Sequence, residues 1–282
     1  MMQGDLVVRK SYRGDVVFRI QDADQQRAIL KGVEFRLLAD APISDLQRIE
    51  DLHLHRGTVQ SLLKTKESVK LLELYKRTQR EKMENGLPFD RDKMPYFELP
   101  GKVLHLDGDP AYLRKSMSVY GELRIPAEGH FVNEVDMAEA LYRLLPLVKP
   151  DIVVITGHDG LLKHRPDPEI HSLNNYKNSI NFARAVRVAR EYERNRDALT
   201  VIAGACQSHF EALLHAGANF ASSPKRILIH ALDPVYIAAK VSYTPIKDTI
   251  NIFDVISHTI SGMEGLGGIE TKGSYRIGLP KI

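Results

Sequence analysis

Two apolar stretches of the sequence each end in a side chain that could do chemistry. Residues 153–156 (Val-Val-Ile-Thr) lead through Gly157 to His158, and residues 201–205 (Val-Ile-Ala-Gly-Ala) lead to Cys206. The chain has one cysteine in 282 residues, so it cannot form an internal disulfide. A thiolate is a nucleophile, and an imidazole is a base that can generate it. This pair is typical of a cysteine hydrolase.

The two side chains can act together only if the fold brings them to one place. An isolated cysteine has a pKa of about 8.5, so at neutral pH it needs a neighbouring base. His158 precedes Cys206 by 48 positions, enough for a helical crossover between adjacent parallel strands, which lie about 4.8 Å apart. For Cys206 alone, a buried structural thiol is the alternative. The matched histidine at a second strand end favours the catalytic interpretation.

The second part of the chain alternates between strand and helix patterns. Strands are predicted at residues 103–107, 152–156, 199–203 and 226–231, and helices at residues 134–147, 181–192 and 209–216. This alternation predicts an α/β domain over residues 99–282, a parallel sheet with helices on both faces. Such sheets carry ligands at the carboxyl ends of their strands, where His158 and Cys206 fall.

The first part of the chain has a different pattern. Residues 1–42 contain short apolar runs separated by turns, which predicts a small SH3-like β-barrel that binds nucleic acid or peptide, or docks a partner or the main domain. Residues 43–98 are expected to form a helical connector and linker. A helical pattern begins at Ser44, and a basic amphipathic helix is predicted over residues 61–82. Between Arg77 and Pro100 the sequence becomes polar and is broken by glycine and proline residues.

The composition limits the kinds of partner and the location that are expected for the protein. The net charge is +3, too small to indicate nucleic-acid binding by itself. No stretch approaches the roughly 18–20 apolar residues that span a bilayer. The first residues carry no basic patch followed by an apolar segment, so no export signal is expected, and the protein is expected to act in the compartment where it is made.

Other residues near the strand ends, and one glycine-rich segment, also have candidate roles. His209 could assist catalysis or cap and pack the start of a helix. Asp107 and Asp109 resemble the acidic pocket of a receiver domain, but are expected to cap the next helix or line the cleft. Main-chain N–H groups of Gly157 or Gly160 could stabilise an oxyanion. The glycine-rich residues 262–273 are expected to form a flexible loop near the substrate groove.

Several motifs carry a family resemblance. The histidine and cysteine blocks resemble those of the caspase, clostripain, gingipain and separase class, from which Asp159 departs by standing where a glycine usually follows the histidine. Four stretches resemble the YabG family of sporulation-specific proteases: Gly-Asp-Leu-Val-Val-Arg-Lys-Ser-Tyr (4–12), Val-Leu-His-Leu-Asp-Gly-Asp-Pro (103–110), Thr-Gly-His-Asp-Gly (156–160) and Gly-Ala-Cys-Gln-Ser-His (204–209).

The resemblance implies a caspase-like fold and a cysteine endopeptidase with a dyad of His158 and Cys206. It also implies protein substrates, namely spore-coat and cortex-related proteins cut beside basic residues, in the mother-cell cytoplasm with the developing coat. The chemistry requires no metal or other cofactor. Basic specificity requires an acidic group in the substrate pocket, for which Asp159 and Asp233 are candidates.

Two further hypotheses remain open. Residues 77–93 could be a site of self-cleavage, because they are basic and contain Gly86 and Pro88. The alternative function, from another class, is a non-catalytic protein that binds nucleic acid or peptide and uses its α/β domain as a receiver-like scaffold.

Overall fold

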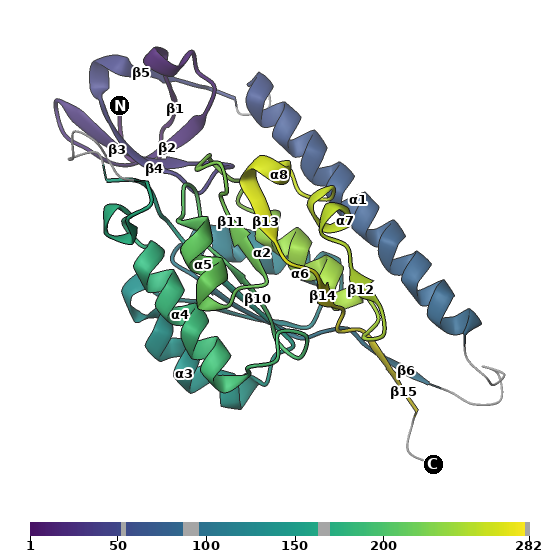
Figure 1. Ribbon diagram of the computed structural model, residues 1–282. Coiled ribbons are helices and arrows are strands. Elements are labelled where there is room, and N and C mark those ends of the chain that lie inside the picture. Colours follow the sequence, from purple (N-terminus) through teal and green to yellow (C-terminus); the bar gives the residue numbers. More distant parts are fainter. Residues whose placement is uncertain (52–54, 87–95, 163–169, 280–282) are drawn as a thin grey trace.

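The centre of the molecule is a six-stranded sheet with the strand order β13-β11-β10-β9-β7-β8. The computed structural model describes residues 1–51, 55–86, 96–162 and 170–279 (Figure 1). The strands are β7 (Val103–Asp107), β8 (Ala127–Phe131), β9 (Ile152–Thr156), β10 (Thr200–Ala203), β11 (Phe220–Ser222) and β13 (Leu266–Gly268). All neighbours are parallel except β13, which is antiparallel to β11. The predicted, mostly parallel sheet is therefore confirmed.

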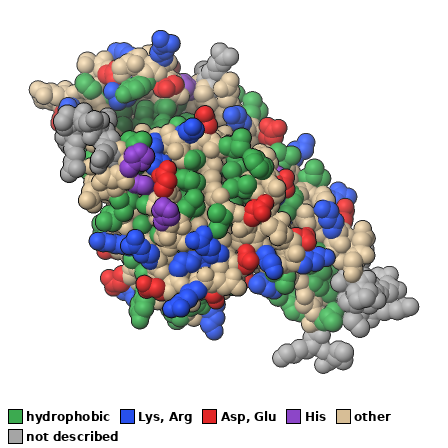
Figure 2. Space-filling view, viewed as in Figure 1, with side chains coloured by type: hydrophobic (Ala, Val, Ile, Leu, Met, Phe, Trp, Pro, Cys, Tyr) green, Lys and Arg blue, Asp and Glu red, His purple; other side chains and the backbone are tan. Residues whose placement is uncertain are grey.

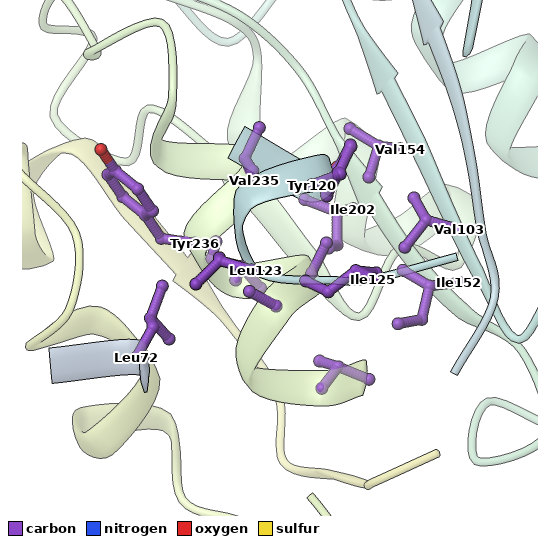
Figure 3. Close-up of a cluster of buried hydrophobic side chains, with 14 of the residues drawn as sticks. Leu72, Val103, Tyr120, Leu123, Ile125, Ile152, Val154, Ile202, Val235 and Tyr236 are labelled. Atoms are coloured by element: carbon purple, nitrogen blue, oxygen red, sulfur yellow. The ribbon is translucent and has the colours of Figure 1, made fainter. Parts of the chain in front are cut away.

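Helices cover both faces of this sheet, as expected. On one face, strand residues Val103, Ile152, Val154 and Ile202 pack with α6 and with parts of α1, α2 and α7 (Figure 3). On the other face, Leu104, Val153 and Val201 and their neighbours pack with α3, α4 and α5. These helices are α1 (Arg56–Asn85), α2 (Pro110–Glu122), α3 (Met137–Val148), α4 (Ser179–Tyr192), α5 (Phe210–Ala216), α6 (Asp233–Tyr243) and α7 (Ile252–Ile256). Because successive residues of a strand point to opposite faces, each of the four inner strands, β7, β9, β10 and β11, contributes to both cores.

The N-terminal region forms a five-stranded antiparallel sheet in the order β4-β3-β2-β1-β5. Its strands are β1 (Leu6–Arg9), β2 (Val17–Ala23), β3 (Arg27–Gly32), β4 (Leu38–Pro42) and β5 (Leu46–Arg48). Val7, Phe18, Ile20 and Leu30 form its own small core. In Figure 1 this sheet lies over one end of the molecule, and α1 runs along the side.

The connector differs from expectation in two places. Helical structure was expected from Ser44, but residues 46–48 pair with β1 as strand β5, because Leu46 is buried in the N-terminal core. A basic amphipathic helix was expected over residues 61–82 and is observed, but α1 is longer. It begins at Arg56 and continues to Asn85, and the Arg77–Glu81 and Arg80–Glu84 ion pairs at helical spacing support its last turns, so the polar stretch after Arg77 begins inside the helix. Residues 77–85 of the hypothetical self-cleavage site are therefore helical, and residues 87–93 lie outside the described residues.

The C-terminal region also differs from expectation in two places. Residues 226–231 were expected to be a strand, but they are irregular apart from one bridge at His230, and the strand is β11, a few residues earlier. Residues 262–273 were expected to be a flexible loop but contain α8 (Gly262–Gly265), the edge strand β13 and β14 (Thr271–Lys272). β14 pairs with β12 (Thr249–Ile250), and β15 (Arg276–Gly278) pairs with β6 (Phe97–Leu99).

Within the described ranges, no helix combines the length and the apolar character needed to cross a membrane.

Candidate active site

Three neighbouring strands end together at the carboxyl edge of the central sheet. β9 lies between β7 and β10, with Thr156 opposite Asp107 and Ile155 opposite Ala203. His158 follows β9 by two residues, and Cys206 follows β10 by three. The predicted adjacency of the two strand ends is therefore observed, and β7 adds a pair of carboxylates, Asp107 and Asp109, at the same edge.

His158 is buried and oriented by a carboxylate. Its Nε2 lies 2.8 Å from Oδ2 of Asp109, and its main-chain N–H donates to Glu134 at 2.8 Å. Nδ1 is buried and has no hydrogen-bond partner in the described part of the chain. Because an ionised carboxylate only accepts, Nε2 carries a proton, and in the neutral imidazole the lone pair is on Nδ1.

Asp109 connects three parts of the structure. It caps α2 by accepting from the Ala111 main-chain N–H, it holds His158, and it accepts from the Lys31 ammonium of β3 at 2.6 Å. Burial acts to raise the pKa of Asp109, but the hydrogen bonds from His158 and Lys31 prevail and hold that pKa well below its usual range. The carboxylate is therefore ionised at neutral pH.

Cys206 has no exposed surface. Its Sγ accepts from the Ile229 main-chain N–H at 3.2 Å and lies 3.7 Å from the Ile229 carbonyl oxygen. Burial raises the pKa of the thiol to about 12, against lowering contributions from the main-chain N–H of Ile229 and from Arg36. In this conformation Cys206 is a neutral thiol that bonds to Ile229 rather than to His158.

The turn that carries the thiol has an unusual backbone. Gly204 has a φ of 109°, and a Cβ at this position would lie 2.9 Å from a methyl of Leu213. Gln207, directly after Cys206, has a backbone φ of 55°, a value that residues other than glycine rarely adopt. Strained positions of this kind cluster at functional sites.

Asp159 and Asp233, the two candidates for basic specificity, are both buried in hydrogen-bond networks. Asp159 accepts from the N–H groups of Gly160 and Asn178 and from the hydroxyls of Ser179 and Ser208. Burial nevertheless raises the pKa of Asp159. Asp233, at the start of α6, accepts from the N–H groups of residues 230, 260 and 261, and burial raises its pKa as well. Both carboxylates join loops together.

The remaining candidates also have defined surroundings. The N–H of Gly160 is donated to Asp159 at 2.9 Å. Gly157 packs against Glu134 so closely that a Cβ would lie 2.5 Å from its carboxylate. His209 caps α5 by accepting from the Ala212 N–H at 3.3 Å, and its Nε2 lies 2.9 Å from the carbonyl of residue 171. The capping role for His209 is therefore observed.

Sequence reasoning missed the N-terminal contribution to this site. Lys31 and the fully buried Arg36 both reach the end of β7, where Arg36 pairs with Asp107. Tyr112 of α2 lies beside His158, with ring centroids 5.8 Å apart. The strand-end motif Asp107–Asp109 was the available signal, but nothing local to residues 31–36 indicates a partner more than 70 positions away.

On the face shown in Figure 2, basic and acidic side chains are interspersed, in keeping with the small net charge.

Comparison with known proteins covers almost the whole chain. Residues 2–280 match the family described as YabG peptidase U57. The chain is 45% identical to the sporulation-specific protease YabG of Bacillus subtilis (strain 168) over 283 residues, which span 98% of this chain and 97% of that protein. A match of this extent and identity, together with the paired strand ends, shows that the chain belongs to the YabG family of peptidases.

Proposed function

We propose that the protein is a cysteine endopeptidase in which Cys206 is the nucleophile and His158 is the general base. The observation that carries this proposal is the end of the β9–β10 pair. Cys206, the only thiol of the chain, and His158, whose imidazole is oriented by Asp109, follow neighbouring strands at one edge of the sheet. Nδ1 of this imidazole has no hydrogen-bond partner among the residues that the structure describes. Membership of a peptidase family favours this function over a non-catalytic scaffold.

The chemistry follows from these groups. His158 Nδ1 takes the thiol proton, and the thiolate attacks the carbonyl carbon of the scissile peptide bond. The tetrahedral intermediate collapses to a thioester on Cys206, and the imidazolium gives its proton to the leaving amine. Water, deprotonated by the same imidazole, hydrolyses the thioester and restores the thiol. No metal or other cofactor enters these steps.

The oxyanion needs main-chain donors. Of the two glycine candidates, Gly160 already donates its N–H to the Asp159 carboxylate, so Gly157 is the better one.

The physiological setting is proposed from the relative. The Bacillus subtilis protein is named a sporulation-specific protease, and 45% identity supports the same setting here. The proposed substrates are spore-coat and cortex-related proteins cut beside basic residues, in the mother-cell cytoplasm with the developing coat.

Removing either catalytic group tests the mechanism. Cys206→Ala and His158→Ala should each lower cleavage of a protein substrate rich in Arg and Lys by more than about a hundredfold, with unchanged circular dichroism. His215→Ala is the matched control, because His215 is exposed on α5, and it should cleave as the wild type does. Normal cleavage by Cys206→Ala would show that the mechanism is wrong.

A further inference from the structure

The segment from the last residue of β3 to the start of β4, residues 32–37, lies against the carboxyl edge of the central sheet. The Ala231 N–H donates to the Glu34 carbonyl at 2.8 Å, and Phe35 forms an antiparallel bridge with His230. The Tyr112 hydroxyl lies 2.5 Å from the carbonyls of both Gly32 and Phe35. The segment is thus held largely through its main chain, as an extended peptide is held when it adds to a sheet edge.

The side chain of Arg36 points inward from this segment and is fully buried. Its Nη1 lies 2.9 and 2.8 Å from the two carboxylate oxygens of Asp107, and its Nη2 donates to the Ala231 carbonyl at 3.0 Å. The guanidinium carbon lies 5.0 Å from the centroid of the Tyr112 ring. A carboxylate, a carbonyl and an aromatic ring are the groups that recognise a guanidinium.

This guanidinium pocket is part of the candidate active site. Residues 229–231 contact both the thiol and the guanidinium: the Ile229 main-chain N–H donates to Cys206 Sγ at 3.2 Å, and the Ala231 carbonyl accepts from Arg36 at 3.0 Å. Arg36 also acts to lower the pKa of the thiol, against the larger effect of burial. Asp107 accepts from the main-chain N–H of Asp109 at 2.9 Å, and Asp109 in turn holds His158. One strand end therefore carries both the carboxylate that binds a basic side chain and the carboxylate that orients the base.

We propose that Asp107 is the residue that selects a basic side chain beside the scissile bond, and that Arg36 occupies its pocket as an internal pseudosubstrate. This inference rests on the proposed peptidase function and names the pocket for its substrate. It explains why the thiol has no exposed surface: the segment that delivers Arg36 covers the position where substrate must bind. Displacing residues 32–37 opens the site.

A binding experiment tests the pocket without requiring peptide hydrolysis. The full chain carrying Cys206→Ala and Arg36→Ala is titrated with N-ethylguanidine, and N-ethylurea serves as the neutral control. Saturable binding is expected for the guanidine only, measured by calorimetry and by a rise in Tm. No binding is expected for Cys206→Ala alone, whose pocket is filled, or when Asp107→Asn is added. Equal binding with and without Asp107→Asn would overturn the proposal.

An activity experiment tests specificity. With Cys206 intact, Arg36→Ala should raise cleavage of a peptide with Arg at the scissile bond at least tenfold over the wild type. The ratio of kcat/KM for that peptide to kcat/KM for its citrulline analogue should fall at least tenfold when Asp107→Asn is added. An unchanged ratio would contradict the role of Asp107. Arg27→Ala, which alters an exposed arginine of β3, is the matched control and should behave as the wild type does.

A third variant covers the case in which Arg36→Ala does not fold. Tyr112→Phe keeps the pocket charges and removes only the hydroxyl that holds Gly32 and Phe35. It should speed alkylation of Cys206 by iodoacetamide at least fivefold, and an unchanged rate would contradict the covering role of the segment. If guanidine binding depends on Asp107 but no variant cleaves any peptide, the pocket stands and the peptidase function is wrong. If the protein cleaves peptides without preference for arginine, the peptidase function stands and the proposed pocket is wrong.

Discussion

The reactivity of Cys206 reports its environment directly. With a pKa of about 12 in the folded protein and about 8.5 when unfolded, the thiolate fraction at pH 7.5 differs on the order of a thousandfold. We expect iodoacetamide to label native Cys206 slower than the thiol in 8 M urea by at least about a hundredfold. Mass spectrometry over time measures both rates. Equal rates would contradict the buried state of the thiol.

Asp109 predicts a pH dependence of stability. The folded pKa of Asp109 lies below its unfolded value of 3.8, so its contribution is present above that value and is lost as pH falls below it. Asp109→Asn keeps a good capping residue for α2 but removes the charge that Lys31 and His158 contact. The fall in the free energy of unfolding from pH 6 to pH 3, measured with urea, should be smaller in Asp109→Asn than in the wild type. A fall of equal size would contradict this pairing.

Single residues were predictable only where the signal is local. His158 and Cys206 stand out because each follows an apolar run, and the structure brings those runs together. The partners Lys31 and Arg36 could not be predicted, because their ion pairs with Asp109 and Asp107 join residues more than 70 positions apart. Neither a lysine in a short strand nor an arginine in the loop that follows it gives any sign of where its charge is neutralised.

At the scale of elements, Asp159 ties the end of β9 to the starts of α4 and α5. Its carboxylate accepts from four donors contributed by these connections. Asp159→Ala leaves these buried donors without an acceptor, so it should lower the free energy of unfolding by roughly 3 kcal/mol or more. Asp40→Ala, which removes an exposed ion pair with Arg27, should change it by less than about 0.5 kcal/mol. Urea denaturation followed by circular dichroism compares the two, and similar losses would contradict this role of Asp159.

The error over residues 226–231 shows how tertiary contacts override local preference. The apolar run predicts a strand, but Arg226 has a φ of 55°, outside the extended region. The main chain of Ile229 bonds to Cys206, and that of Ala231 bonds to Glu34. These groups are therefore not available to a sheet ladder. The strand that does form, β11, consists of only three residues, too few for a periodic signal.

At the scale of the whole molecule, the two sheets should unfold together. The buried Arg36–Asp107 pair and the partly buried Lys31–Asp109 pair join the N-terminal region to the central sheet. Separating the sheets would break both ion pairs and the main-chain hydrogen bond between Ala231 and Glu34, so the two sheets stabilise each other. Hydrogen exchange measured by mass spectrometry should give amides of β3 and β9 similar opening free energies. Exchange of β3 in a separate, earlier step would contradict this coupling.

The fold class was predictable, but the relation between its two parts was not. Alternating strands and helices at 103–216 specify a parallel sheet because only helical crossovers join its strands. The placement of the N-terminal sheet depends instead on a few long-range contacts of residues 31–37, which have no sequence period. The site therefore contains groups from a region that was assigned to a separate domain.

The connection between β3 and β4 has a consequence for sequence variation within the family. A loop between two strands ordinarily tolerates insertions and deletions. Here Glu34 and Arg36 must reach fixed partners at the central sheet while both flanking strands stay paired. One added or lost residue would move Arg36 out of register with Asp107. Related chains should therefore vary in composition along this loop far more readily than in length.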